Sequence, residues 1–240
     1  MLILRRTFLA CLLLLAAFGG ARTAEPQPLR VLFIGNSYTY GNDLPAMLDE
    51  LSKAGKQRPL ELGRELQGGY TLEKHWQEGK AAKKIAEQPW DVVVLQEHSL
   101  RPISERKLMF DYAAKFDEAI KKRGAKTLLY LTWARQGKGE TQGALSKAYL
   151  DLATDLKAQV APAGVAWEMA LKGDDKLALH QADKSHPTKT GTYLTACVFY
   201  GALHGKSPEG LPAKIGGVSD DEAKRLQATA WKAVQGVGGK

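Results

Sequence analysis

Residues 91–96 read DVVVLQ, a run of four apolar residues between an acidic residue and an amide. So short an uninterrupted apolar run is typical of a β-strand that is buried on both faces, as strands are in a parallel sheet with helices on each side. Four other stretches have the same character, although the second strand along the chain is less apolar. The predicted strands are residues 29–34 (LRVLFI), 60–66, 91–96, 127–132 (TLLYLT) and 160–166.

Stretches with apolar residues at helical spacing lie between and after these strands. They cover residues 43–54, 71–87, 104–123, 141–158, 188–203 and 220–235. Local signals agree with two of the boundaries: Ser219 and Glu222 form a capping box, and Gly124 follows a basic run that is typical of a helix C-terminus. The alternation of strands and helices predicts an α/β protein with a doubly wound, three-layer α/β/α architecture and about five parallel strands.

The length and the composition indicate one domain. The chain has 240 residues, of which 44% are hydrophobic, and neither a linker nor an internal repeat divides it. We therefore predict a single domain over residues 25–240. The formal net charge is +8, but the lysines are scattered along the predicted helices, and no strand carries the basic and aromatic pattern of an RNA-binding sheet. Nucleic acid is thus not expected as a partner.

The first residues have the pattern of a secretory signal peptide. Two arginines precede the apolar run 7–18, and small residues follow at positions 19–21. The run is too short for a bilayer, which requires about 20 apolar residues. We predict a signal peptide over residues 1–21 with cleavage between residues 21 and 24, a secreted or periplasmic location, and no membrane attachment of the mature chain.

The sequence contains no recognisable metal motif. Its five histidines and two cysteines form neither a C-x-x-C nor an H-E-x-x-H pattern. Removal of the signal peptide would leave Cys197 alone, which excludes a disulfide within the mature chain. We predict neither a metal nor a cofactor.

Polar and glycine residues follow the predicted strands, at the edge where doubly wound sheets bind ligands. Ser37 follows the first strand, Gly69 the second and Gln96 the third, and Asp183 and His186 come after the fifth. A serine hydroxyl becomes nucleophilic when a base takes its proton, and His186 can do so near neutral pH with Asp183 orienting its ring. We predict these three residues as catalytic. The backbone N–H groups of Ser37 and Gly69 and the Gln96 amide are the predicted oxyanion donors.

These blocks resemble those of the SGNH hydrolases, also termed GDSL-like hydrolases. The first block is similar to FIGNSYT at residues 33–39, with Ser37 at the position of the family's nucleophile, and the last is similar to DKSH at residues 183–186. GYT at residues 69–71 resembles the glycine block and makes Gly69 the expected donor. The resemblance covers most of the mature chain and implies an esterase or lipase on a flavodoxin-like fold.

The third block departs from the family pattern. Where the family has Gly-x-Asn-Asp, residues 94–99 read VLQEHS, so Gln96 either replaces the usual asparagine in the oxyanion hole or bonds the neighbouring loop backbone. The combination of blocks is similar to a secreted subgroup, and related branches of the superfamily deacetylate carbohydrates. Tyr38, Tyr70 and Trp133 near the strand ends are candidates for an aromatic rim on which a sugar stacks.

We expect a secreted serine esterase that removes small acyl groups, with acetyl as the first candidate, from a carbohydrate. Its substrate would be a small ester or an acylated glycan, and Arg101 and Arg135 could attract an acidic one. One alternative is a lipase or thioesterase for longer acyl chains. Another is a carbohydrate-binding module that kept the fold and lost turnover, which the altered third block would explain.

Overall fold

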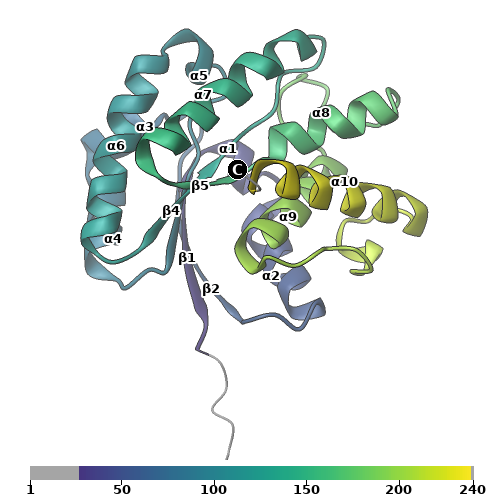
Figure 1. The fold of residues 1–240 in the computed structure, drawn as a ribbon, viewed down its shortest axis with the longest axis horizontal. Coiled ribbons are helices and arrows are strands. Elements are labelled where there is room, and N and C mark those ends of the chain that lie inside the picture. The colour runs from purple at the N-terminus through teal and green to yellow at the C-terminus, as the bar shows by residue number, and fades with distance from the viewer. Residues whose placement is uncertain (1–26, 239–240) are drawn as a thin grey trace, which may run out of the picture.

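The computed structural model describes residues 27–238 and shows a central parallel sheet (Figure 1). The sheet has five strands in the spatial order β2-β1-β3-β4-β5, and every neighbouring pair is parallel. The strands are β1 (Leu29–Gly35), β2 (Leu60–Leu66), β3 (Val92–Leu95), β4 (Lys126–Tyr130) and β5 (Gln159–Ala161). The predicted doubly wound sheet is confirmed, and its strand order is that of flavodoxin-like folds.

Helices connect and cover these strands. The α-helices are α1 (Ser37–Tyr40), α2 (Leu44–Ala54), α3 (Leu72–Glu78), α4 (Lys80–Glu87), α5 (Arg101–Ser104), α6 (Arg106–Lys122), α7 (Gln142–Leu156), α8 (Ala163–Gly173), α9 (Lys189–His204) and α10 (Asp220–Gly238). Short 3-10 turns cover Gly41–Asp43, Gly139–Thr141 and Ala213–Ile215. The sequence pattern predicts most of these helices but not the short α1 and α5 or α8.

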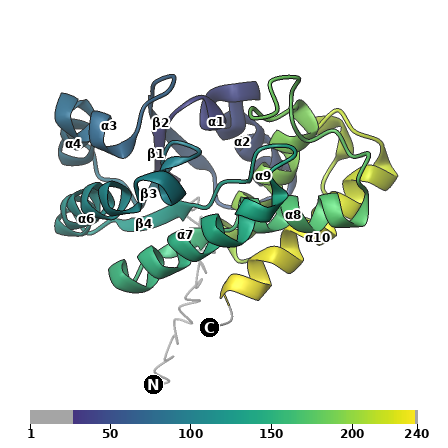
Figure 2. The ribbon, with the colours of Figure 1, turned by 90° about the horizontal axis from the view of Figure 1, so that it is seen from above.

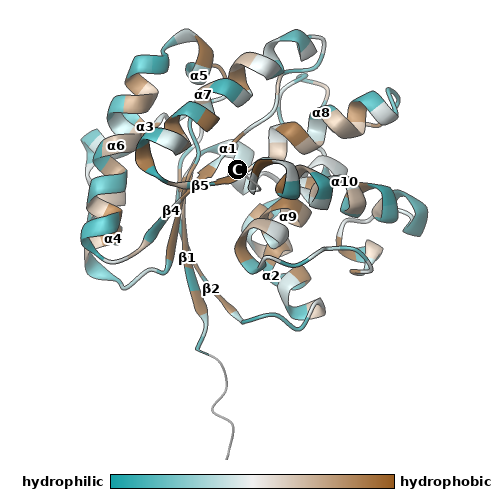
Figure 3. Ribbon diagram, viewed as in Figure 1, coloured by the Kyte–Doolittle hydropathy of each residue, from teal (hydrophilic) through white to brown (hydrophobic). Residues whose placement is uncertain are grey.

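The strands bury side chains on both faces. On β1, Val31 and Phe33 face one helical layer while Leu32 and Ile34 face the other, because successive side chains alternate across a strand. Figure 2 shows the sheet between α3, α4 and α6 on one side and α2, α8, α9 and α10 on the other. In Figure 3 the strands are mostly apolar, as two-sided burial requires.

Two predicted elements differ clearly in the structure. The fifth strand is shorter because Pro162 follows it and the chain turns at once into α8. Gly164 permits this turn, since a Cβ there would lie 2.0 Å from the carbonyl oxygen of Thr132. The predicted helix over residues 71–87 is divided into α3 and α4 at Gly79, whose φ of +76° is left-handed and favours glycine.

The strand order reverses at β1, because β2 pairs on one side of it and β3 on the other. The chain leaves β1 towards the layer of α2 and leaves β3 towards the layer of α6, so the loops after these strands diverge. Doubly wound proteins bind ligands at this point. Among residues 27–238, no helix is long and apolar enough to cross a membrane, and no group of metal-ligating side chains is found. The predicted signal peptide lies outside the described residues.

Candidate active site

Ser37 lies at this reversal point, at the first residue of α1. Asn36 begins the helix as its N-cap: its side-chain oxygen accepts the N–H of Tyr38 at 3.1 Å. The Asn36 amide also donates to the carbonyl of Tyr70 at 2.9 Å. Asn36 therefore joins the turn that carries Ser37 to the glycine turn after β2.

Gln96, the residue after β3, holds the same turn. Its side-chain oxygen accepts the N–H of Asn36 at 2.8 Å and the hydroxyl of Thr39 at 3.1 Å, and its amide donates to the Glu97 carbonyl at 2.6 Å. Gly35 permits this approach, because a Cβ there would meet the Gln96 oxygen at 2.6 Å. Gln96 is fully buried, so it supports the turn from inside the protein.

Ser37, His186 and Asp183 form one chain of hydrogen bonds. The Ser37 hydroxyl lies 2.7 Å from Nε2 of His186, although the two residues are 149 positions apart in the sequence. Nδ1 of the same ring bonds Oδ2 of Asp183. When Nδ1–H donates to the carboxylate, Nε2 can accept the serine proton, so this arrangement can generate a serine nucleophile.

Asp183 is fixed as an acceptor by its own loop. Its Oδ1 accepts the backbone N–H groups of Ser185 and His186, each at 2.9 Å. The hydrogen bond from the His186 ring, followed by those from the two N–H groups, lowers the pKa of Asp183 to about 2. The carboxylate is therefore ionised near neutral pH, the form that orients a histidine.

Two backbone donors that the sequence predicts for the oxyanion hole remain available. Within residues 27–238, neither the N–H of Ser37 nor that of Gly69 donates a hydrogen bond to another group. Gly69 has a left-handed φ of +69° with open space beside it, so backbone conformation rather than crowding favours glycine there. The buried Gln96 amide donates to the Glu97 backbone, which corresponds to the second of the two roles expected for Gln96, bonding of the neighbouring loop backbone.

Two of the three residues expected at an aromatic rim are buried. The Trp133 ring stacks on Tyr38 at 4.7 Å and on Trp167 at 3.8 Å between centroids. Trp133 and Tyr38 are only 1% and 4% exposed, so packing covers the ring faces that a sugar would need. Tyr70 is partly exposed and is the member of the three that a substrate can reach.

The aromatic stack also anchors the loop that carries His186. The hydroxyls of Tyr38 and Ser185 share a hydrogen bond of 2.6 Å, and the Trp133 indole N–H donates to the Ser185 carbonyl at 3.0 Å. Because Tyr38 directly follows Ser37, it links the nucleophile's turn to the histidine loop. No sequence motif marks Ser185, and sequence reasoning did not find this link.

A buried carboxylate, Glu97, lies behind the end of β3. Its Oε1 accepts the N–H of His98 at 2.6 Å and that of Leu72 at 3.3 Å, which joins the β3 end to the start of α3. Burial raises the pKa of Glu97 to about 7, although the hydrogen bonds and the neighbouring Arg101 act in the opposite direction. Glu97 is not among the predicted site residues, because burial of a charged side chain leaves no local pattern.

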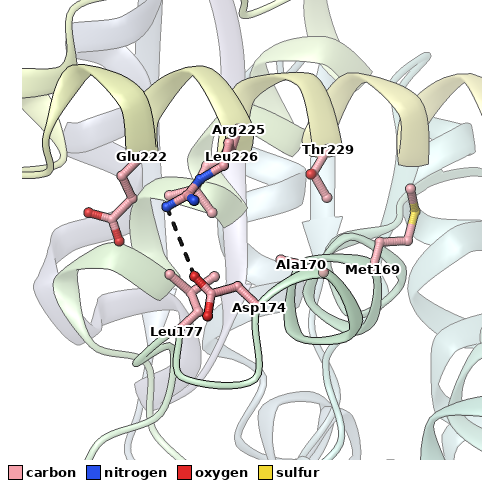
Figure 4. Close-up of a pocket in the computed structure, with 9 residues that line it drawn as sticks. Met169, Ala170, Asp174, Leu177, Glu222, Arg225, Leu226 and Thr229 are labelled. Atoms are coloured by element: carbon pink, nitrogen blue, oxygen red, sulfur yellow. Dashed lines mark ion pairs between the residues drawn. The ribbon is translucent and has the colours of Figure 1, made fainter.

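The structure has cavities both beside the candidate site and away from it. One of about 260 Å³ lies between α8 and α10, where Leu226 and Leu177 lie beside an ion pair of Arg225 and Asp174 (Figure 4). A second, of about 630 Å³, lies by the edge strand β5, and a third, of about 270 Å³, adjoins Trp133. None of the three is lined by Ser37.

The fold and the site together define a class of protein. A parallel sheet of order 2-1-3-4-5, a serine two residues after its first strand and an Asp-x-x-His segment that meets this serine are the features of an SGNH-like hydrolase. This is the class that the sequence blocks resemble. No family model matches the sequence, and a search of curated proteins finds no match either.

Solved structures confirm the class. A protein from Slackia heliotrinireducens that is classed as an SGNH hydrolase is 27% identical, with a TM-score of 0.63 over 74% of this chain and 100% of its own. A DUF4886 family protein from Bacteroides uniformis is 22% identical, with a TM-score of 0.68 over 87% of this chain and 95% of its own. An acetyl xylan esterase is 18% identical, with a TM-score of 0.57 over 72% of this chain and 99% of its own. The last two show the shared fold alone. The chain is thus an SGNH-like hydrolase, in agreement with the predicted enzyme class of carboxylic ester hydrolases.

Proposed function

We propose that the protein is a secreted serine esterase that removes small acyl groups, above all acetyl, from a carbohydrate. The observation that carries the proposal is the chain of hydrogen bonds from the Ser37 hydroxyl through His186 to Asp183, with 2.7 Å between the first two groups. A serine that only caps a helix has no need of such a partner. The signal-peptide pattern of residues 1–21 supports secretion.

In the proposed reaction the Ser37 oxygen attacks the acyl carbon while Nε2 of His186 takes the serine proton. The N–H groups of Ser37 and Gly69 bind the resulting oxyanion. The bond between the acyl carbon and the sugar oxygen then breaks, and His186 gives its proton to the departing alcohol. Water attacks the acyl-enzyme with His186 again as the base, which releases the carboxylic acid and restores Ser37.

Two features support a substrate that has a short acyl group on a large carbohydrate. A long acyl chain needs an apolar pocket at the nucleophile, whereas the partly apolar cavity of about 270 Å³ beside Trp133 adjoins the histidine loop and is not lined by Ser37. The side chains of His186 and Asp183 are 37% and 47% exposed, so a polymer can approach the site. One of the similar solved structures is named as an acetyl xylan esterase.

The test is hydrolysis of p-nitrophenyl esters from acetate to decanoate by the mature chain. We expect the highest kcat/KM for acetate, and we expect Ser37→Ala to lower kcat by about 10⁴-fold or more with an unchanged circular dichroism spectrum. Ser207→Ala is the matched control, because it removes a serine hydroxyl on the loop between α9 and α10. Turnover in Ser37→Ala equal to that of the wild type would refute the serine mechanism.

The other outcomes separate the alternative functions. An optimum at longer chains would favour a lipase or thioesterase. Binding of acetylated glycans without hydrolysis that depends on Ser37 would favour a carbohydrate-binding module. Mass spectrometry of the exported chain tests secretion, with an expected N-terminus between residues 22 and 25.

A further inference from the structure

Arg135 is held at the edge of the sheet that carries the candidate triad. It lies on the loop after β4, and its Nη2 donates to the hydroxyl of the buried Ser99 at 3.2 Å, which ties it to the loop after β3. The next residue, Gln136, donates its N–H to the carbonyl of Lys184 at 2.9 Å. The Arg135 segment is therefore bonded directly to the loop that carries Asp183 and His186, and the guanidinium is positioned rather than freely mobile.

A second cation lies on the other side of the serine turn. The Lys74 ammonium lies 5.7 Å from the centroid of the Tyr70 ring, and the Tyr70 carbonyl accepts the Asn36 amide next to Ser37. Lys74 is exposed on α3. Cationic side chains thus come from the loops and helices after both β2 and β4, the strands that flank β1 and β3 in the sheet.

The carboxylates of this edge do not neutralise these two cations. Glu73 and Glu105 both pair with Arg101, and Asp183 pairs with His186. Within residues 27–238, no carboxylate oxygen lies within 4.0 Å of the charged nitrogens of Lys74 or Arg135. Arg101, which the sequence analysis grouped with Arg135, is buried and paired and therefore has a structural role.

His98 lies near both of these cations. It lies two residues after Gln96 at the end of β3. Its pKa is lowered first by partial burial and then by the nearby charges of Arg135, Arg101 and Lys74. The edge therefore favours an anion over a further cation.

A cavity beside Arg135 has room for part of the glycan that carries the ester. Its volume is about 270 Å³, and Trp133, Trp167 and Leu171 contribute apolar lining while Arg135 and Gln136 contribute polar groups. Trp133 also bonds the Ser185 carbonyl, so the cavity adjoins the histidine loop. A cavity of this size with mixed lining suits one sugar unit. Its other charges are of both signs, since Lys172, Glu168 and Asp175 also line it.

We propose that Arg135, assisted by Lys74, binds a carboxylate of the glycan that carries the ester, so that the preferred substrates are acylated polysaccharides of uronic acids. The inference rests on the proposed function and specifies its substrate class. The planar fork of a guanidinium matches a carboxylate with two parallel hydrogen bonds, which gives Arg135 the leading part and Lys74 a supporting one.

The first test compares two substrates that differ only in charge: acetylated oligogalacturonate and the same oligosaccharide with its carboxylates methyl-esterified. Acetate release alone is measured. We expect kcat/KM to be at least about ten-fold higher for the charged substrate, as a charge-assisted contact predicts, and the ratio to fall with added salt. Arg135→Gln should bring the ratio close to one, and Lys74→Gln should reduce it less.

Arg123→Gln is the control, because it removes the same charge from the exposed turn before β4, at the opposite edge of the sheet, and should preserve the ratio. A ratio near one in the wild type, or an unchanged ratio in Arg135→Gln, overturns the inference. Failure of the proposed function gives a different result, namely no hydrolysis of p-nitrophenyl acetate that depends on Ser37.

A binding measurement tests the inference without catalysis. Calorimetry with Ser37→Ala and unacetylated oligogalacturonate should show binding that Arg135→Gln, added to the same background, weakens about ten-fold. Folding of each variant is checked by its Tm. Absence of binding, equal affinity in both proteins, or equal affinity for the methyl-esterified oligosaccharide contradicts carboxylate recognition by Arg135.

Discussion

The side-chain oxygen of Gln96 accepts the backbone N–H of Asn36 at 2.8 Å, so the end of β3 holds the residue that directly precedes Ser37. The same oxygen accepts the Thr39 hydroxyl at 3.1 Å. One buried side chain thus satisfies two donors on either side of the serine. The position of the candidate nucleophile depends on Gln96, although Gln96 itself does not face the reacting ester in the proposed mechanism.

Gln96→Ala should reduce both stability and turnover. The buried N–H of Asn36 would lose its acceptor, which costs about 1–3 kcal/mol, and displacement of the serine turn should lower kcat by about 10- to 100-fold. Urea unfolding and ester hydrolysis measure the two effects. Gln227→Ala is the control. This buried glutamine of α10 accepts the Gly210 N–H at 2.9 Å, so its replacement should affect stability alone. A normal kcat in Gln96→Ala would contradict the positioning role.

Tyr38→Phe removes the hydroxyl that bonds Ser185 at 2.6 Å and keeps the ring that stacks on Trp133. The histidine loop should lose one of its anchors, so we expect kcat to fall several-fold while KM changes little, and the buried Ser185 hydroxyl that loses its partner should lower stability by about 1–3 kcal/mol. Steady-state kinetics on p-nitrophenyl acetate provide the readout. Tyr193→Phe, which loses a bond to Gln227 instead, should leave kcat unaffected. Equal kinetics in the two variants would show that the Ser185 contact is dispensable.

Asp183→Asn keeps an oxygen for the loop N–H groups but loses the negative charge that orients His186. We expect kcat to fall by about 10²- to 10⁴-fold, which is less than for Ser37→Ala. The pKa of Asp183 is lowered to about 2 from an ordinary 3.8, so its carboxylate stabilises the fold above about pH 4 and loses this contribution as the pH falls towards 2. Acid unfolding of Asp183→Asn should lack this component. Wild-type kcat in the variant would exclude Asp183 from the mechanism.

Glu97→Gln should change how stability depends on pH. Burial raises the pKa of Glu97 to about 7 from an ordinary 4.5, so the native state binds this proton more tightly than the unfolded chain does. Wild-type stability should therefore decline between about pH 4.5 and pH 7 and level off above that range. The glutamine side chain of the variant resembles the neutral carboxyl. The decline in the free energy of unfolding, on the order of 3 kcal/mol in the wild type, should therefore be absent from the variant. Glu61→Gln at an exposed position is the control, and an identical pH profile in wild type and Glu97→Gln would refute the buried titration.

The sequence by itself determined the layered fold and the candidate residues for the chemistry. Uninterrupted apolar runs such as VVVL report two-sided burial locally, and alternation with helical patterns leaves few topologies other than a doubly wound sheet. The carboxyl ends of its strands then identify Ser37 and Gly69 as candidates, whereas the Asp183 to His186 segment, which lies beyond α8, is indicated by its Asp-x-x-His spacing and by the resemblance to SGNH hydrolases. The inference of the fold succeeds because burial and strand ends are encoded by neighbouring residues, while the catalytic role of these candidates stays a prediction.

Only the tertiary structure decided what the individual side chains around the serine do. Tyr38 and Trp133 have the residue types of a sugar-binding rim, yet they stack on each other because distant segments pack there. Gln96 points its amide at the Glu97 backbone, whereas Arg135 is left without a carboxylate partner among the described residues. Burial, hydrogen-bond partners and local charge balance arise from contacts between residues far apart in the chain, so no local pattern could predict them.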